Sequence, residues 1–269
     1  MTVADRILDY EDYVRRKLAL VTRSGLDVKP RECGLFDHQR VLVEWALRRG
    51  CAAIFADTGL GKSRMQLAWA DAVHLATGRD VLILAPLAVA AQTVAEGAEI
   101  GVCVTHCRES DDVRPGVNII NYDRLHKLDC SRFAGVVLDE SSVIKHHNSK
   151  TFQFLTDTFR LTPYKLCATA TPAPNDWTEL GTHAEFLGIC SRAEMLAEYF
   201  CHDGGETQVW RLKGHARHLF WQWVATWGAM IRKPSDLGFD DGRYNLPPLH
   251  VHQHTVESCM ETANEAGFL

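Results

Sequence analysis

One short segment combines an apolar run, a glycine-containing turn and the start of a helical pattern: Cys51-Ala52-Ala53-Ile54-Phe55-Ala56-Asp57-Thr58-Gly59-Leu60-Gly61-Lys62-Ser63. The glycines let the backbone turn with its N–H groups pointing inward at phosphate oxygens, Lys62 supplies a mobile positive charge, and the Ser63 hydroxyl can bind Mg²⁺. A helix over residues 62–75 would add its positive N-terminal end to the same site. The segment therefore predicts a loop for the phosphates of a nucleoside triphosphate, formed by Thr58, Gly59, Leu60, Gly61, Lys62 and Ser63.

The rest of the first two hundred residues alternates short apolar, β-branched runs with helical patterns. Such alternation is typical of an α/β fold whose parallel sheet is covered by helices on both faces. Ligands of these folds bind at the carboxyl edge of the sheet. We expect strands near residues 51–56, 81–85, 102–106, 117–120, 134–138 and 164–168.

The composition excludes several classes of protein. The chain has 269 residues, a net charge of -5 and 46% hydrophobic residues, which favours one large domain with appendages. No apolar run approaches membrane-spanning length, and the first twenty residues lack the pattern of a signal peptide. The nine cysteines have neither zinc-site spacing nor the density of a disulfide scaffold. We expect a cytoplasmic protein that has no membrane partner.

A pair of carboxylates follows the predicted strand at 134–138. An ATPase needs one carboxylate to hold Mg²⁺ and a second group to orient the attacking water, and Asp139 and Glu140 supply both. An Asp-Glu pair on its own is an ordinary strand-end turn. Together with the phosphate loop it indicates ATP hydrolysis, with Lys62, Asp139 and Glu140 as catalytic residues and Ser63 and Asp139 as Mg²⁺ ligands.

Four further segments resemble motifs of superfamily-2 helicases, and of Swi/Snf-like ATPases in particular. They are Leu35-Phe36-Asp37-His38-Gln39-Arg40; Leu82-Ile83-Leu84-Ala85-Pro86-Leu87 with Gln92; Leu138-Asp139-Glu140-Ser141-Ser142-Val143-Ile144-Lys145 with Ser149-Lys150; and Ala168-Thr169-Ala170-Thr171-Pro172-Ala173-Pro174-Asn175 with Thr178-Glu179-Leu180 and Phe186-Leu187. Their order and spacing match the family over residues 35–187.

This resemblance implies a fold and a function. The fold is a RecA-like P-loop lobe, and the function is that of an ATP-hydrolysing DNA helicase or translocase in which two such lobes clamp ATP. In the family, Gln39 would read adenine, and Thr169 and Thr171 would couple hydrolysis to movement. The compact motifs suggest a bacterial or phage source. The residues that we expect to contact double- or single-stranded DNA are Pro86, Gln92, Asn121, Tyr122, Lys145, Lys150, Arg211, Lys213 and Arg217.

The sequence also suggests how the chain is divided. We expect an N-terminal helical segment (1–28), the RecA-like domain (29–189), a helical, aromatic-rich extension (190–245) and a linker (246–269) towards a second RecA-like domain that this chain lacks. Without the arginines of that second domain, this chain should hydrolyse ATP weakly or not at all. A DNA-binding module without hydrolysis and a P-loop kinase are the alternatives. Ser142 stands where the family has His or Asp, which leaves its coupling role open.

Overall fold

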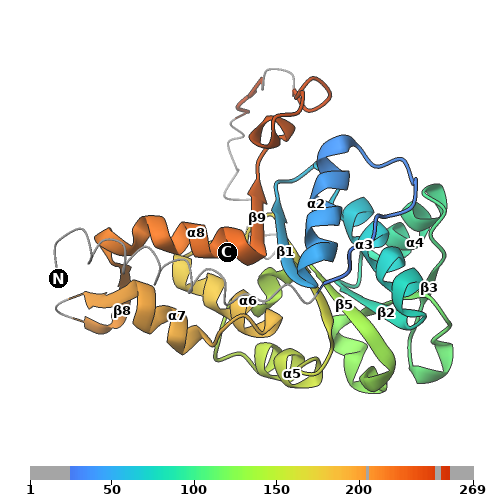
Figure 1. Ribbon diagram of the computed structural model, residues 1–269, viewed down its shortest axis with the longest axis horizontal. Coiled ribbons are helices and arrows are strands. Elements are labelled where there is room, and N and C mark those ends of the chain that lie inside the picture. Colours follow the sequence, from blue (N-terminus) through green and yellow to red (C-terminus); the bar gives the residue numbers. More distant parts are fainter. Residues whose placement is uncertain (1–24, 204–205, 246–249, 255–269) are drawn as a thin grey trace, which may run out of the picture.

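The computed structural model describes residues 25–203, 206–245 and 250–254. Most of the predicted N-terminal segment and of the predicted linker lies outside the described residues. The described chain contains a seven-stranded sheet of order β3-β4-β2-β5-β6-β1-β9, in which every neighbouring pair is parallel (Figure 1). Its strands are β1 (Cys51–Ala56), β2 (Asp80–Ala85), β3 (Val104–His106), β4 (Val117–Asn121), β5 (Phe133–Asp139), β6 (Tyr164–Ala168) and β9 (Gly228–Ile231).

Helices cover both faces of this sheet, so the predicted α/β class is confirmed. Alternate side chains of each strand enter two apolar clusters: Ile54 packs with α2, α3 and α4 on one face, and Phe55 packs with α5, α6 and α8 on the other. The helices are α2 (Asp37–Arg49), α3 (Lys62–Thr77), α4 (Ala90–Glu99), α5 (Lys150–Thr158), α6 (Leu180–Leu187), α7 (Arg192–Tyr199) and α8 (Arg217–Trp227).

An extension projects from one end of the sheet and then returns to it (Figure 1). It contains α7, an antiparallel hairpin of β7 (Phe200–Asp203) and β8 (Glu206–Leu212), and α8. The sequence predicts helices here, whereas the structure also contains the hairpin and β9, which the sequence pattern does not indicate. Strand β9 pairs with β1, with Ala53 opposite Gly228 and Ala56 opposite Ile231, so the extension is attached to the sheet at both ends.

No helix in the described ranges is both long enough and apolar enough to cross a lipid bilayer.

Candidate nucleotide and nucleic-acid site

The predicted site residues of the motifs gather at one edge of the sheet. Because all its strands run in the same direction, the loops after β1, β2, β4, β5 and β6 leave from the same side. These loops carry, in that order, residues 57–61, Pro86, Tyr122, Glu140 and residues 169–171.

The loop between β1 and α3 has the backbone of a phosphate cradle. Gly59 and Gly61 have φ values of 83° and 77°, in the left-handed region that favours glycine. A Cβ at Gly61 would also collide with the side-chain amide of Gln39. The amine of Lys62 donates to the carbonyl oxygens of Ala56 at 3.0 Å and Asp57 at 3.3 Å, so it already points into the loop. The loop thus brings backbone N–H groups and a mobile cation together.

Gln39 fastens the start of α2 to this loop. Its side chain is 2% exposed; its Nε2 donates to the Leu60 carbonyl at 3.0 Å, and its Oε1 accepts from the Phe36 N–H at 3.0 Å. The predicted adenine-reading residue therefore lies directly beside the phosphate loop.

Asp139 and Glu140 lie in different environments although they are adjacent. Burial raises the pKa of Asp139, and a hydrogen bond from Gln66 Nε2 at 2.7 Å to its Oδ1 opposes that shift. Glu140 is exposed and has a φ of 51°, and it is the one non-glycine with positive φ in the part of the chain that the structure describes. Such a conformation costs about 1–3 kcal/mol and persists where the surroundings hold it. The two carboxylates thus differ in burial and in backbone conformation.

One of the two predicted coupling residues, Thr169, contacts the second carboxylate, and the other, Thr171, contacts Thr169. Thr169, which is fully buried, donates from its hydroxyl to Glu140 Oε2 at 3.2 Å and accepts from the Thr171 N–H at 3.1 Å. One chain of hydrogen bonds thus joins the residues that follow β5 and β6.

The two serines after Glu140 face different surroundings. Ser142 lines a surface hollow together with Glu140, whereas Ser141 is buried with its hydroxyl 3.1 Å from His183 Nε2. Burial lowers the pKa of His183 to about 4, so this histidine is neutral near pH 7. His183 could not be found from the sequence, because a single histidine in the α6 pattern gives no sign of a partner 42 residues earlier.

Four of the predicted nucleic-acid contacts line this hollow, which we call the edge hollow. It has a volume of about 550 Å³, and its lining includes Pro86, Asn121, Tyr122 and Lys145. The Tyr122 hydroxyl donates to the Asp139 carbonyl at 2.7 Å, and burial raises its pKa well above the usual value. This side of the sheet edge thus places four predicted nucleic-acid contacts next to Glu140.

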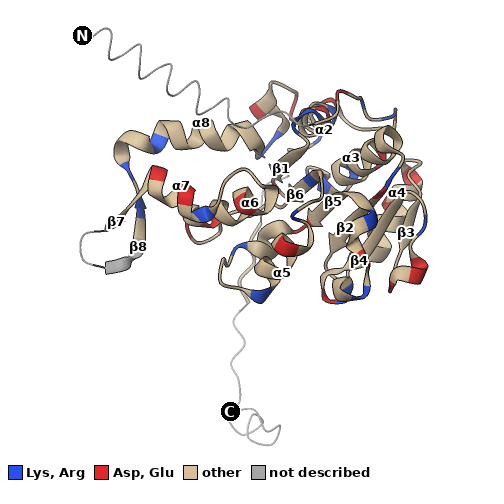
Figure 2. Cartoon of the chain, turned by 60° about the horizontal axis from the view of Figure 1, so that its bottom comes forward, with Lys and Arg blue, Asp and Glu red and all other residues tan. Residues whose placement is uncertain are grey.

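The remaining predicted contacts lie elsewhere. Gln92 lies within α4 and donates to Glu96, and Lys150 begins α5; neither lines the edge hollow. Arg211, Lys213 and Arg217 lie at the outer end of the extension, away from the sheet (Figure 2). The structure therefore does not bring these three basic residues to the edge where the motifs meet.

The chain is similar in fold to several solved structures. The SWI2/SNF2 ATPase core of Sulfolobus solfataricus in complex with dsDNA matches with a TM-score of 0.63 and 16% identity, over 80% of this chain and 48% of that chain. The SWI2/SNF2 ATPase core domain of the same organism gives a TM-score of 0.59 and 18% identity, over 83% and 48%. The Hef helicase domain of Pyrococcus furiosus gives 0.50 and 17%, over 60% and 39%. The chain thus spans about half the length of the two SWI2/SNF2 structures, and the predicted RecA-like fold is confirmed.

Comparison with curated proteins finds no match. A family model described as the SNF2-related domain, however, matches residues 38–201, which is more than half of the chain. The matched residues include Gln39, the phosphate loop, both carboxylates and the Thr169 network. The chain therefore belongs to the SNF2-related domain family.

Proposed function

We propose that this chain is the N-terminal, ATP-binding lobe of a DNA translocase or helicase that hydrolyses ATP to ADP and phosphate. The observation that carries the proposal is the meeting of the phosphate loop, the carboxylate pair and the Thr169 network at one edge of the sheet. Membership of the SNF2-related domain family supports the same conclusion.

The residues present fit ATP and Mg²⁺. The positive φ values of Gly59 and Gly61 suit a loop whose backbone N–H groups face phosphate oxygens, and the Lys62 amine lies on the concave side. A hydroxyl and a carboxylate are oxygen ligands of the kind that Mg²⁺ prefers, and here they would come from Ser63 and Asp139. Bound Mg²⁺ would neutralise charge on the phosphate oxygens. Gln39, whose amide bonds to Leu60 and Phe36 in this structure, would exchange such a hydrogen bond for one to the adenine.

Glu140 would act on the attacking water. Its Oε2 accepts from Thr169, which leaves Oε1 to accept a hydrogen bond from that water and then its proton. Thr169 would position Glu140 through this hydrogen bond. Thr171 follows Thr169 in the same network, so a displacement of the loop after β6 would be transmitted to Glu140.

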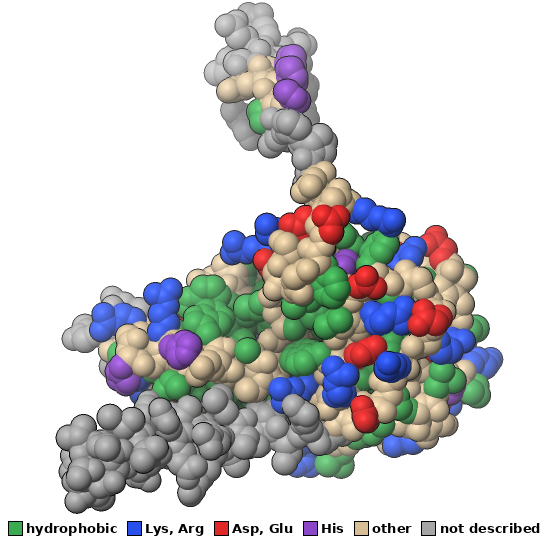
Figure 3. All heavy atoms as spheres, turned by 45° about the horizontal axis from the view of Figure 1, so that its top comes forward, with side chains coloured by type: hydrophobic (Ala, Val, Ile, Leu, Met, Phe, Trp, Pro, Cys, Tyr) green, Lys and Arg blue, Asp and Glu red, His purple; other side chains and the backbone are tan. Residues whose placement is uncertain are grey.

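The second lobe would dock beside the loop after β6. An open hollow of about 590 Å³ is lined there mainly by apolar residues, including Phe55, Pro172, Trp177 and Met230. Trp177 and Met230 are 47% and 40% exposed. Hydrophobic side chains also gather in Figure 3 where the extension joins the sheet. A second lobe would cover this surface and supply arginines, which are worth about 10³–10⁵ in rate in related phosphoryl-transfer enzymes.

The proposal can be tested on this chain by binding and hydrolysis together. We expect it to bind a fluorescent ATP analogue with Mg²⁺ and, separately, a duplex oligonucleotide, and to show no DNA-stimulated hydrolysis. Failure to bind the ATP analogue would overturn the nucleotide site. Strong DNA-stimulated hydrolysis would overturn the two-lobe proposal. In an enzyme that carries both lobes, binding of ATP and DNA without hydrolysis would favour a nucleotide-dependent DNA-binding module instead.

A further inference from the structure

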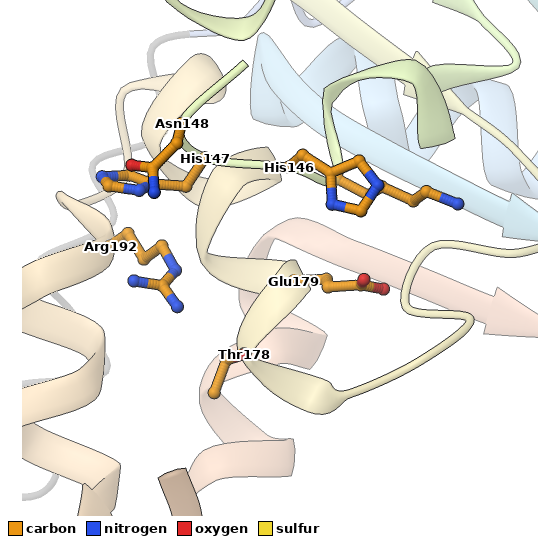
Figure 4. Close-up of a pocket in the computed structure, with 7 residues that line it drawn as sticks. His146, His147, Asn148, Thr178, Glu179 and Arg192 are labelled. Atoms are coloured by element: carbon orange, nitrogen blue, oxygen red, sulfur yellow. The ribbon is translucent and has the colours of Figure 1, made fainter. Parts of the chain in front are cut away.

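A third cavity, of about 410 Å³, lies beside the edge hollow and is lined only by polar and charged residues. We call it the Arg192 pocket. Figure 4 shows Arg192, His147 and Asn148 together on one side of it and Glu179 on the other. Its lining residues are Lys145, His146, His147, Asn148, Thr178, Glu179 and Arg192. This lining suits a charged ligand rather than an apolar one.

The Arg192 guanidinium is partly withdrawn from water and has no contacting counter-ion. Burial lowers its pKa. Among the described residues, no carboxylate lies within ion-pair distance of this guanidinium, and Asp176 and Glu185 act on it from farther away. Glu185 accepts the backbone N–H of Arg192 at 2.8 Å and so holds the start of α7. Because desolvating a cation without a paired anion is costly, the site favours an anionic ligand.

The direction of the Arg192 side chain is set by packing. A Cβ at Gly181 would lie 2.8 Å from Arg192 Cγ and 3.2 Å from Arg192 Cβ. The methylene groups of Arg192 therefore lie directly against the α6 backbone at Gly181, while the charged end extends into the pocket (Figure 4).

The one carboxylate that lines the pocket, Glu179, already accepts hydrogen bonds from Asn175. Glu179 Oε1 accepts from Asn175 Nδ2 at 2.7 Å, and its Oε2 accepts from the Asn175 N–H at 3.3 Å. The other side chains supply donors: a guanidinium fork, an amide, two imidazoles and an amine. Arg192, His147 and Asn148 lie together on one side of the pocket (Figure 4), and planar donors grouped in this way suit the oxygens of a phosphate group.

We propose that the Arg192 pocket binds a phosphodiester group of the nucleic-acid strand that crosses the edge hollow. Lys145 lines both cavities, so the two adjoin, and a strand that crosses the edge hollow would pass this lysine on its way to the Arg192 pocket. This proposal rests on the proposed function and adds Arg192 to the residues that contact the nucleic-acid strand. The sequence analysis included Lys145 and did not include Arg192.

The test compares the salt dependence of duplex binding for the unmodified chain, Arg192→Gln, Arg192→Lys and Arg160→Gln. Arg160 is exposed and lies in the loop before β6, at the opposite edge of the sheet, so it serves as the control. Fluorescence anisotropy in phosphate-free buffer gives the slope of log K against log salt. We expect Arg192→Gln to reduce that slope by about 0.9 and to weaken binding roughly tenfold at low salt, because one phosphate contact is lost. Arg192→Lys should retain most of the slope, and Arg160→Gln all of it.

Each outcome assigns the failure to one proposal. Equal slopes for Arg192→Gln and the unmodified chain, with normal thermal unfolding, would overturn the Arg192 proposal and leave the proposed function intact. If the unmodified chain binds the ATP analogue but no nucleic acid, the proposal that this lobe binds nucleic acid is overturned as a whole. Calorimetric titration with inorganic phosphate then decides the ligand: binding that Arg192→Gln abolishes would assign the pocket to free phosphate and overturn its role on nucleic acid.

Discussion

The Thr169 hydroxyl donates to Glu140 Oε2 at 3.2 Å, so a residue that follows β6 holds the carboxylate that follows β5. Removing this donor should misplace Glu140 without touching the phosphate loop. In a two-lobe enzyme we expect Thr169→Val to lower kcat roughly 10- to 100-fold, the range for one lost hydrogen bond to a charged group. KM for ATP should stay within about twofold. Thr169→Ser should restore kcat; equal losses in both variants would exclude this positioning role.

Glu140→Gln should separate binding from hydrolysis. The amide keeps the size of the side chain and an oxygen that accepts from Thr169, but it does not take a proton from water. We expect normal affinity for the ATP analogue and, in a two-lobe enzyme, a loss of turnover of roughly 10²-fold or more. Turnover close to normal would show that another group orients the water.

Lys62→Ala should abolish measurable binding of the ATP analogue. Among the described residues the amine donates hydrogen bonds to the loop carbonyls of Ala56 and Asp57 alone, so its removal should leave the fold unchanged. Fluorescence titration measures the affinity, and circular dichroism melting provides the control for folding. Retained affinity with an unchanged melt would contradict the assigned loop.

His183 should make the fold sensitive to acid. Its pKa is about 4 in the folded chain against an ordinary value of 6.5, so the unfolded chain binds more protons between these values. Stability should therefore fall as the pH decreases from about 6.5 towards 4, with a slope of up to about 1.4 kcal/mol per unit. Burial also lowers the pKa of His38, which acts in the same sense, whereas the raised pKa of Asp139 acts in the opposite sense at lower pH.

Urea unfolding at pH 5 and pH 7.5 measures this dependence. The double variant Ser141→Ala/His183→Leu removes the titrating group together with its hydrogen-bond partner. It should reduce the slope of unfolding free energy against pH, and the part of that slope that comes from His38 should remain. An unchanged slope would show that His183 is not the acid-sensitive group.

Lys213 should act on stability rather than on nucleic acid. Its amine donates to the carbonyl oxygens of Ala197 and Glu198, both at 2.9 Å, at the C-terminal end of α7. Lys213→Met should therefore lower the free energy of unfolding by about 1 kcal/mol and leave the salt slope of DNA binding unchanged. Arg217, which is exposed at the start of α8, should show the reverse in Arg217→Gln: unchanged stability and a slope lower by about 0.9. A lower salt slope of DNA binding for Lys213→Met would instead show that Lys213 contacts the nucleic acid.

The strands and the glycine-containing turn between β1 and α3 could be predicted because their signals are local. The runs at 51–56 and 134–138 are apolar for the length of a buried strand, and the glycines at 59 and 61 allow the turn that the phosphate loop requires. Residues 228–231 escaped prediction because Gly228-Ala229-Met230-Ile231 is short and directly follows the helical pattern of α8. Only its place beside β1 makes it a strand.

The parts of the site that escaped prediction depend on residues far apart in the chain. Ser141 and His183 come together because β5 ends against α6, and the Arg192 pocket forms because the loop at 145–148 meets the start of α7. Nothing in the neighbouring sequence of His183 or Arg192 marks either one. The basic residues 211–217 are neighbours in the sequence and therefore suggested one cluster of nucleic-acid contacts. In the structure, however, Lys213 caps the C-terminal end of α7.

The pairing of β1 with β9 affects how the protein forms during its synthesis. Strand β1 leaves the ribosome about 170 residues before Gly228–Ile231 does, a delay of roughly 10–30 s at ordinary elongation rates. Through this interval the N–H and C=O groups along one side of β1 have no neighbour and can template wrong pairings. The N–H of Asp57, at the start of the phosphate loop, also bonds to the Ile231 carbonyl at 3.0 Å. The loop between β1 and α3 is therefore among the last parts of the lobe to reach its final form on a growing chain.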